Sequence, residues 1–390
     1  MNSAKSFAVI GGGTLGSLIA LRLSNLGLNV EIFESKAELL KGASHLGEGK
    51  IHLGYTYGLS QESSYEQLIE SALNFADDVE GAISKPVDWK KITSIPFSYK
   101  VANDSLISPD EFINHGRKII NTIRQKKHLE TYLGLPVEKI IDFERTSVRS
   151  FITSERSVDL EKLREILITE LVVRENITIN VNSEIMSVKI DADNKYILST
   201  NSDKLEQRFD YVINCTWEKR YLLDRMFWDK LPDLNYRTKL YVSAKTSLQE
   251  FACTTVLGKY RDLVIFNTGR LYGSDYLTGL TSFTNEVLPN FAERESLPEE
   301  LVTKHWEYLK SRFILEVPEL SEVTGITTFE RSVVAIGDSD IDQFDSGLHD
   351  RSPHYLNRKG NYISALGTKI TTIPQLAKKI EDWISSDGFK

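Results

Sequence analysis

Two histidines and an arginine are the residues that could accept a proton from a substrate or bind a negatively charged one. His52 and His354 can each act as a general base or as a hydrogen-bond partner, because imidazole changes charge near neutral pH. Arg331 follows the apolar approach to Phe329, and a buried guanidinium without an anion is costly. We therefore expect Arg331 to hold a carboxylate or phosphate of the substrate. The alternative is an ion pair with Glu330 or with another nearby acid.

The N-terminal 34 residues have the pattern that binds a nucleotide phosphate. An apolar run at 7–10 leads into Gly11-Gly12-Gly13-Thr14-Leu15-Gly16, a helical pattern follows, and a second apolar run ends at Glu34. This is the dinucleotide-binding fingerprint in its strand, helix and strand setting. We expect a tight turn at Gly11, close approach of a pyrophosphate at Gly13, close helix packing at Gly16 and a ribose contact at Glu34. The predicted dinucleotide-binding residues are Gly11, Gly13, Thr14, Leu15, Gly16, Glu34 and Ser35, and the fingerprint alone does not separate FAD from NAD.

The segment 42–58 predicts a loop close to a ligand, followed by a short strand. It holds five glycines, two histidines and two tyrosines, which no regular helix would accommodate. We expect Ser44 to bind the pyrophosphate and Tyr57 to line the substrate pocket, although core packing would also explain the tyrosine.

Composition limits the class of protein. The chain has 390 residues, a formal net charge of −8 and two cysteines outside any metal-binding spacing. We therefore expect no nucleic-acid partner, no metal site and no disulfide framework. No stretch is apolar enough to span a membrane, and the chain enters a strand without room for a signal peptide, so we expect a cytoplasmic protein.

The order of elements predicts an α/β fold with a Rossmann-like dinucleotide-binding domain built from discontinuous pieces, and a substrate domain with a mixed or antiparallel sheet. The apolar run 209–214 is expected to return to the sheet that begins at Phe7. A second sheet of about four strands is expected from the alternating segments between 236 and 284, and 326–337 is expected to form a strand pair. The predicted domains are 1–85, 150–225 and 325–390 for the nucleotide, and 86–149 and 226–324 for the substrate.

Three separated motifs resemble the D-amino-acid oxidase/glycerol-3-phosphate dehydrogenase superfamily of FAD-dependent oxidoreductases. They are the fingerprint ending at Glu34, the segment 50–57, which resembles K-L-I-H-G-G-L-R-Y, and the turn 367–372, which resembles G-G-K-x-T-T. Weaker likenesses lie between them: the strand to Cys215-Thr216-Trp217 resembles A-T-G-x-W, Phe329–Ser332 resembles the L-R-P strand and Arg351–His354 resembles S-R-x-H. Thr56 stands where the glycerol-phosphate enzymes carry arginine, so the superfamily is supported but glycerol 3-phosphate as substrate is not.

The resemblance implies FAD as cofactor and a role for each matched position. The turn after Gly367 would present backbone N–H groups to the flavin, which adds Gly367, Thr368, Lys369, Ile370, Thr371 and Thr216 to the expected cofactor-binding residues. Lys369 would also line the active site, Arg351 would help to bind an anionic substrate, and His45 marks a position that is covalently linked to flavin in some amine-oxidising relatives. The expected catalytic residues are His52, Tyr57, Arg331, Arg351, His354 and Lys369.

The expected reaction is hydride transfer from a C–H bond next to an amine or hydroxyl of a small anionic substrate to flavin N5. Three alternatives remain open from the sequence. Gly337-Asp338 after an apolar strand weakly resembles a motif of flavin-dependent monooxygenases. A plain NAD dehydrogenase and a non-catalytic flavoprotein would also carry the fingerprint.

Overall fold

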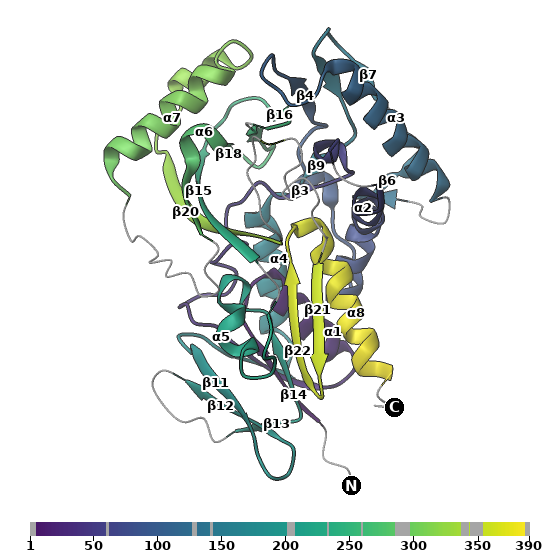
Figure 1. Ribbon diagram of the computed structural model, residues 1–390, viewed down its shortest axis with the longest axis vertical. Helices are drawn as coiled ribbons and strands as arrows, with labels where there is room; N and C mark the ends of the chain where they lie inside the picture. The colour runs from purple at the N-terminus through teal and green to yellow at the C-terminus, as the bar shows by residue number, and fades with distance from the viewer. Residues whose placement is uncertain are drawn as a thin grey trace.

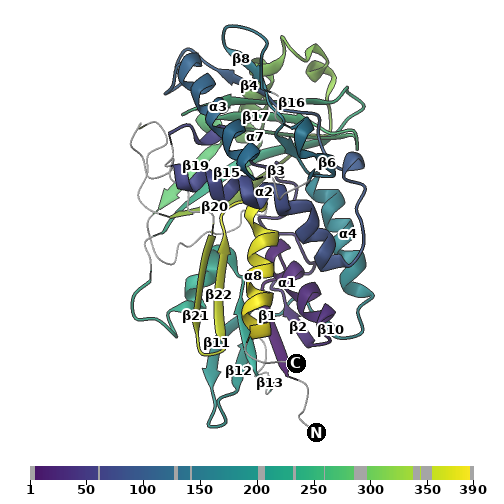
Figure 2. The same ribbon diagram turned by 90° about the vertical axis from the view of Figure 1, so that its right-hand side faces the viewer.

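The computed structural model describes residues 5–59, 62–126, 131–140, 143–200, 207–231, 234–258, 260–284, 297–336, 343 and 354–386. The molecule is elongated, with one sheet beside the two termini and a second sheet at the opposite end (Figure 1). In the view turned by 90°, helix α2 (Glu62–Ile83) crosses between the two halves (Figure 2).

The first sheet is the predicted dinucleotide-binding sheet. In the described part of the chain it has six strands in the order β10-β2-β1-β14-β22-β21. All neighbours pair in parallel except β21, which is antiparallel to β22. Their bounds are Ser6–Ile10 (β1), Asn29–Phe33 (β2), Ile177–Asn180 (β10), Tyr211–Asn214 (β14), His354–Lys359 (β21) and Tyr362–Gly367 (β22). The return of the chain beside Phe7 is confirmed, because Phe7 pairs with Tyr211.

The two faces of this sheet are covered differently. Phe7 and Val9 pack in the core with the helices α1, α2, α4 and α8, whereas Ala8 and Ile10 pack against a small antiparallel sheet and helix α5. The alternation along β1 therefore buries both faces of the strand. The helices are α1 (Thr14–Asn25), α4 (Leu160–Val172), α5 (Arg220–Asp224) and α8 (Ile373–Ser386), and the small sheet is β11 (Ile185–Ile190), β12 (Tyr196–Thr200) and β13 (Arg208–Phe209).

The second sheet is larger than the sequence predicted. Within the described ranges it has nine strands, ordered β19-β15-β18-β17-β16-β4-β8-β7, with β20 also paired to β15. The prediction of about four strands was wrong because β4, β7 and β8 join from a distant segment, and such pairing leaves no local signal. The bounds are Ser98–Val101 (β4), Glu144–Arg145 (β7), Ser150–Ile152 (β8), Leu234–Lys245 (β15), Phe251–Val256 (β16), Arg261–Ile265 (β17), Arg270–Asp275 (β18), Leu280–Thr284 (β19) and Thr327–Ile336 (β20).

Segment 327–336 is one long strand and not the predicted strand pair. β20 runs antiparallel to β15 over ten register pairs, from Leu234 opposite Ile336 to Ser243 opposite Thr327. Since β20 belongs to the second sheet, we propose that 327–336 goes with the substrate domain and that 354–386 completes the nucleotide domain. The rest of the predicted division stays a proposal.

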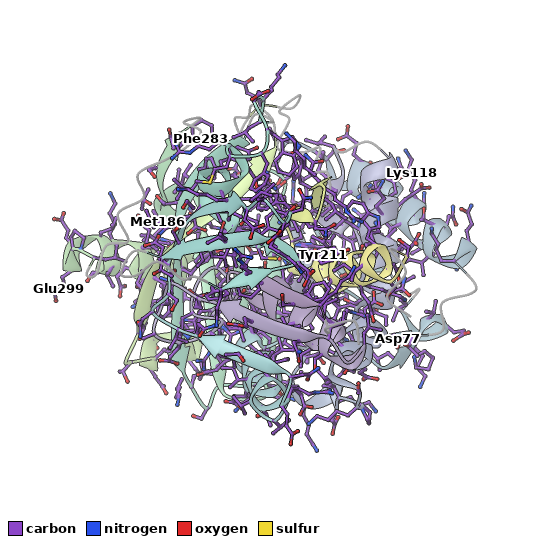
Figure 3. The ribbon with its side chains drawn as sticks, turned by 90° about the horizontal axis from the view of Figure 1, so that it is seen from below. Asp77, Lys118, Met186, Tyr211, Phe283 and Glu299 are labelled. Atoms are coloured by element: carbon purple, nitrogen blue, oxygen red, sulfur yellow. The ribbon has the colours of Figure 1, made fainter. Side chains whose placement is uncertain are left out.

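Helices also flank the second sheet. Helix α3 (Pro109–Gln125) begins where Ser108 and Glu111 form a reciprocal capping box, with Pro109 at the first helical position. Helix α7 (Glu299–Phe313) comes later in the chain and packs against the short helix α6 (Tyr276–Gly279). Lys118 on α3 and Glu299 on α7 lie on opposite sides of the molecule seen from below (Figure 3).

A buried ion pair ties α5 to the first sheet. Arg220 and Asp224 are both fully buried, with Arg220 Nε 3.1 Å from Asp224 Oδ2. Asp224 also accepts hydrogen bonds from Asn214 and Tyr362 at 2.9 Å and from Ser364 at 2.6 Å. These partners lie on β14 and β22, so one carboxylate joins the helix to both strands.

We expect Asp224→Ala to lower the free energy of unfolding by about 3–5 kcal/mol, because it leaves the buried guanidinium of Arg220 without its anion. Urea unfolding followed by circular dichroism measures this. Asp193→Ala is the matched control, since Asp193 forms an exposed ion pair with Arg208 and its side chain is 71% exposed. Equal unfolding midpoints for the two variants would contradict the structural role of Asp224.

Candidate functional site

One large cavity of about 900 Å³ runs from the first sheet to the second. Its walls include the turns that follow β1, β14 and β22, and also residues of β15 and β17 in the second sheet. In parallel strands the carboxyl ends meet at one edge of the sheet, and this is where α/β folds bind ligands. Gly11, Thr216 and Gly367 each follow or end one of these three strands, so segments far apart in the sequence reach the same cavity.

The first turn has the geometry of a phosphate cradle. Gly11 has φ +100°, and a Cβ there would lie 2.7 Å from the carbonyl oxygen of Cys215. Gly16 does not line the cavity; a Cβ on it would lie 2.0 Å from the carbonyl oxygen of Gly11, so its role is helix packing. The N-cap residue Gly13 offers no side-chain cap, and the backbone N–H of Thr14 donates to Ser44 Oγ at 3.1 Å. The helix start is thus open toward the cavity, where it favours negative charge.

Glu34 is held in place by the backbone around it. Its Oε2 accepts from the N–H of Gly12 at 2.8 Å, and its Oε1 accepts from the N–H of Lys36 at 2.9 Å and from Ser35 Oγ at 3.2 Å. Glu34 and Ser35 both line the cavity. A carboxylate has about four lone-pair sites, so Glu34 retains capacity to accept from ribose hydroxyls.

The C-terminal turn faces the same cavity. Gly367, Thr368, Lys369 and Ile370 line it, and the 3₁₀ helix Ile370–Thr372 has no side-chain cap. Thr371 is buried and does not line the cavity: its hydroxyl accepts from the N–H of His52 at 2.9 Å and donates to the carbonyl of Lys50 at 3.2 Å. Thr371 therefore fastens the turn to the segment 50–52.

The remaining predicted cofactor-binding residues also line the cavity. These are Leu15, Ser44, His45 and Thr216. His45 Nε2 lies 3.4 Å from Lys41 Nζ, and the hydroxyl of Thr216 donates to Asn214 at 2.8 Å. The start of α1 and the turn 367–370 border one cavity, which fits FAD, because this cofactor has a pyrophosphate near its middle and a flavin at one end.

His52 and Glu155 form a buried pair beside the C-terminal turn. The strands β3 (Lys50–Ile51) and β9 (Arg156–Ser157) pair antiparallel with Ile51 opposite Arg156, which brings His52 next to Glu155. His52 Nδ1 lies 3.2 Å from Glu155 Oε1, and Glu155 also accepts from the hydroxyl of Tyr99 and from the N–H of Leu53 at 2.8 Å. Thr56 is the only other polar contact of the ring in the described part of the chain, again at Nδ1, at 3.4 Å.

The charge state of this pair follows from burial. Burial lowers the pKa of His52 to about 4, against the opposing effect of Glu155, and the ammonium groups of Lys369 and Lys50 lower it further. Burial would raise the pKa of Glu155, but the hydrogen bond from His52, the charge of Lys50 and the hydrogen bond from Tyr99 hold it below its usual range. At neutral pH the pair is then an anionic Glu155 and a neutral His52 protonated at Nδ1, which leaves the Nε2 lone pair free.

A second buried group of charges lies in the cavity wall. Lys50 Nζ is 2.6 Å from Glu48 Oε1 and 3.1 Å from Asp262 Oδ1, and it donates to Thr254. Burial would lower the pKa of Lys50, but Asp262 and Glu48 outweigh it and raise that pKa. Burial and Asp262 raise the pKa of Glu48 to about 7. Lys50 thus forms ion pairs with two carboxylates at the same time.

The predicted catalytic residues divide into two sets. His52, Tyr57 and Lys369 line the cavity together: the rings of His52 and Tyr57 lie 5.4 Å apart and Lys369 Nζ lies 6.0 Å from the Tyr57 ring. Arg331 lies in β20 with its Cα opposite that of Lys239, and His354 begins β21 opposite Gly367. The side chains of Arg331 and His354 and the whole of Arg351 lie outside the described residues.

The charged residues of the site that were missed from the sequence include Glu48, Lys50, Glu155, Lys239 and Asp262. Glu155 is fully buried, and Lys239 and Asp262 are 5% and 7% exposed. The signal that was used for Arg331, a charged residue within a predicted strand, also applies to Lys239 in the predicted strand 236–247 and to Asp262 at the start of 262–268. Glu155 lies outside a regular strand and leaves no such signal.

The comparison with protein-family models identifies the family. The model of the FAD dependent oxidoreductase family matches residues 6–382. A search of curated protein sequences finds no match. Within the described residues there is no helix with the length and apolarity needed to cross a membrane.

Solved structures with the same fold include three oxidases. Glycine oxidase from Geobacillus kaustophilus superposes with a TM-score of 0.66 at 14% identity, over 98% of this chain and 94% of that one. Iminodiacetate oxidase from Chelativorans sp. BNC1 gives 0.69 at 12% identity, over 97% and 95%. L-α-glycerophosphate oxidase from Mycoplasma pneumoniae, solved with FAD bound, gives 0.61 at 14% identity, over 97% and 94%.

We expect Glu34→Ala to raise the dissociation constant for FAD roughly 10- to 100-fold, because it removes charge-assisted hydrogen bonds at the first turn. Flavin content after purification and titration of the apoprotein with FAD measure the change. Glu31→Ala is the control, since Glu31 lies on β2, which ends one residue before Glu34, and does not line the cavity. The same FAD affinity in both variants would remove Glu34 from the cofactor site.

Proposed function

This chain belongs to the family of FAD-dependent oxidoreductases, and we propose that it oxidises the CH–OH group of a small anionic substrate. Bound FAD supplies the acceptor for the hydride. The chain is an FAD-dependent oxidase or dehydrogenase acting on CH–NH or CH–OH groups. The choice of an alcohol within that class is our proposal.

The observation that carries the proposal is the pair of His52 and Glu155. Oxidation of an alcohol needs a base for the hydroxyl proton, whereas oxidation of an amine needs only the neutral amine. His52 lines the cavity, is neutral above a pKa of about 4 and directs its Nδ1 proton to Glu155. In our proposal the substrate hydroxyl donates its proton to His52 Nε2, and the anionic Glu155 stabilises the imidazolium that forms.

The remaining expected residues are proposed to bind and orient the substrate. Lys369 places a positive charge beside His52, which suits an acidic group next to the oxidised carbon. Tyr57 packs against the His52 ring and would close that side of the pocket. Arg331, Arg351 and His354 are proposed as further contacts to an anionic substrate. The first turn and the C-terminal turn are proposed to hold FAD across the cavity, with Glu34 at the ribose.

A second candidate is oxidation of an amine. It is favoured by the similarity to proteins named glycine oxidase and iminodiacetate oxidase. The two candidates separate in anaerobic flavin reduction by matched pairs of substrates, such as lactate against alanine and malate against aspartate. Reduction by the hydroxy acid of a pair supports our proposal, and reduction by the amino acid alone contradicts it.

We expect His52→Gln and Glu155→Gln each to slow anaerobic flavin reduction by roughly 10²- to 10⁴-fold, because the first removes the base and the second removes its counter-charge. Stopped-flow absorbance of the flavin measures the rate, and flavin content shows that the cofactor is still bound. His305→Gln is the matched control: His305 is also buried with a pKa lowered to about 4, but it bonds Thr278 and does not line the cavity. Unchanged reduction in His52→Gln would remove His52 from the reaction.

The rate of flavin reduction should depend on pH in a way that reflects the lowered pKa of His52. Only neutral His52 can accept the proton, so the rate should stay level from pH 8 to about pH 6 and be lost as pH falls through about 4. Single-turnover reduction across this range measures the profile. A loss centred near 6.5, the ordinary value for histidine, would contradict the burial of the unprotonated ring.

A further inference from the structure

Lys239 is a buried ammonium in the wall of the cavity that the second sheet provides. It lies on β15, is 5% exposed and lines the cavity together with Tyr241 and Tyr276. Its Nζ lies 3.7 Å from the centre of the Tyr276 ring and 5.5 Å from that of Tyr241. Such cation–π contacts orient the ammonium, but an aromatic face does not replace the hydrogen-bond acceptors that three N–H donors require.

The contrast with Lys50 shows what Lys239 lacks. Lys50 has two carboxylates and a hydroxyl as partners. Lys239 has no carboxylate oxygen within 4.0 Å and no hydrogen-bond acceptor among the described residues. Its Nζ is not among the fully enclosed polar atoms that lack a partner, so the ammonium is reached from the cavity, and a ligand group that accepts hydrogen bonds is expected to bind there.

The acidic residues near Lys239 are occupied by other partners. Glu48 and Asp262 both form ion pairs with Lys50, and Asp262 also accepts a hydrogen bond from Thr254 at 2.7 Å. Asp275 accepts from the N–H groups of Leu277 and Thr278, which begin helix α6. The charge of Lys239 favours the anionic form of all three carboxylates: it opposes the rise that burial causes in the pKa of Glu48 and of Asp275, and with Lys50 it keeps the pKa of Asp262 low. None of the three forms an ion pair with Lys239.

Lys239 and Lys369 mark two different parts of the cavity. Lys369 belongs to the C-terminal turn and acts on His52, whereas Lys239 belongs to the second sheet and acts on Glu48 and Asp262. The Cα of Arg331 lies opposite that of Lys239 in the pairing of β20 with β15, so two basic residues occupy the same register position. The cavity thus offers one positive charge beside the proposed base and another at its far wall.

We propose that the substrate carries two anionic groups, one next to the oxidised carbon beside Lys369 and a second bound by Lys239. This inference rests on the proposed function for the position of the first group only. The second group is a carboxylate or a phosphate, since both accept several hydrogen bonds from an ammonium. The rings of Tyr241, Tyr272 and Tyr276 form the wall that packs against the carbon chain between the two groups.

Binding of unreactive acids to the FAD-loaded protein tests this proposal without turnover. The probes are butanoate, succinate and 3-phosphonopropanoate, which share one carboxylate and differ in the group at the other end. We expect succinate or 3-phosphonopropanoate to bind roughly 10- to 100-fold more tightly than butanoate, the range of a charge-assisted hydrogen bond. Isothermal titration calorimetry gives the dissociation constants, and the tighter of the two dianions identifies carboxylate or phosphate.

Variants of Lys239 then separate this residue from the general charge of the cavity. Lys239→Met should abolish the preference for the dianion and leave butanoate binding unchanged, and Lys239→Arg should retain most of the preference. Lys245→Met is the matched control, because Lys245 is on the same strand but exposed. Flavin content and circular dichroism confirm that each variant is folded. Equal binding of butanoate and both dianions by the wild type, or an unchanged preference in Lys239→Met, would overturn the proposal.

Failure of the two-anion proposal and failure of the proposed alcohol oxidation give different results. If no hydroxy acid reduces the flavin but the dianion preference depends on Lys239, the two-anion site stands and the alcohol chemistry fails. If hydroxy acids reduce the flavin without any dianion preference, the chemistry stands and the second site fails. Malate against 2-hydroxybutanoate is the corresponding pair for turnover.

Discussion

The hydrogen bond between His52 and the buried carboxylate of Glu155 is the interaction on which the account of the site depends. In the proposed mechanism it fixes the proton at Nδ1 and leaves Nε2 available to act as the base. Three parts of the chain converge to make it. The pairing of β3 with β9 aligns the two residues, Tyr99 of the second sheet donates to the carboxylate, and Thr371 of the C-terminal turn receives the N–H of His52. A change in any of these contacts would reorient the imidazole.

The parallel pairing of β1, β14 and β22 places distant segments at one site. Each strand ends at the same edge of the sheet, so the turn after Ile10, Thr216 after Asn214 and the turn after Gly367 all border the cavity. The second sheet closes the far side with Lys239 and Asp262. The end of the cavity at the first sheet is thus bordered mainly by turns, and the end at the second sheet by side chains of long strands.

The local features of the fold could be predicted from the sequence, and the long-range ones could not. Gly11 and Gly13 define their turn through steric requirements within a few residues, so both the turn and helix α1 were recognised. The motif containing His52 and the turn containing Lys369 were found because each is a compact pattern. Glu155 was missed because its significance arises only when β9 pairs with β3, a contact between residues about a hundred positions apart. The joining of β4, β7 and β8 to the second sheet was missed for the same reason.

The most direct measurement of the central claim is the tautomer and charge of His52 in the FAD-loaded protein. Nitrogen-15 NMR of histidine-labelled protein, with His52→Gln to assign the signal, reports the protonation of each ring nitrogen as pH is varied. The account predicts a neutral ring at pH 7 with the proton on Nδ1, a bare Nε2, and protonation only as pH falls toward about 4. A proton on Nε2 at neutral pH, or an imidazolium near pH 6.5, would contradict it.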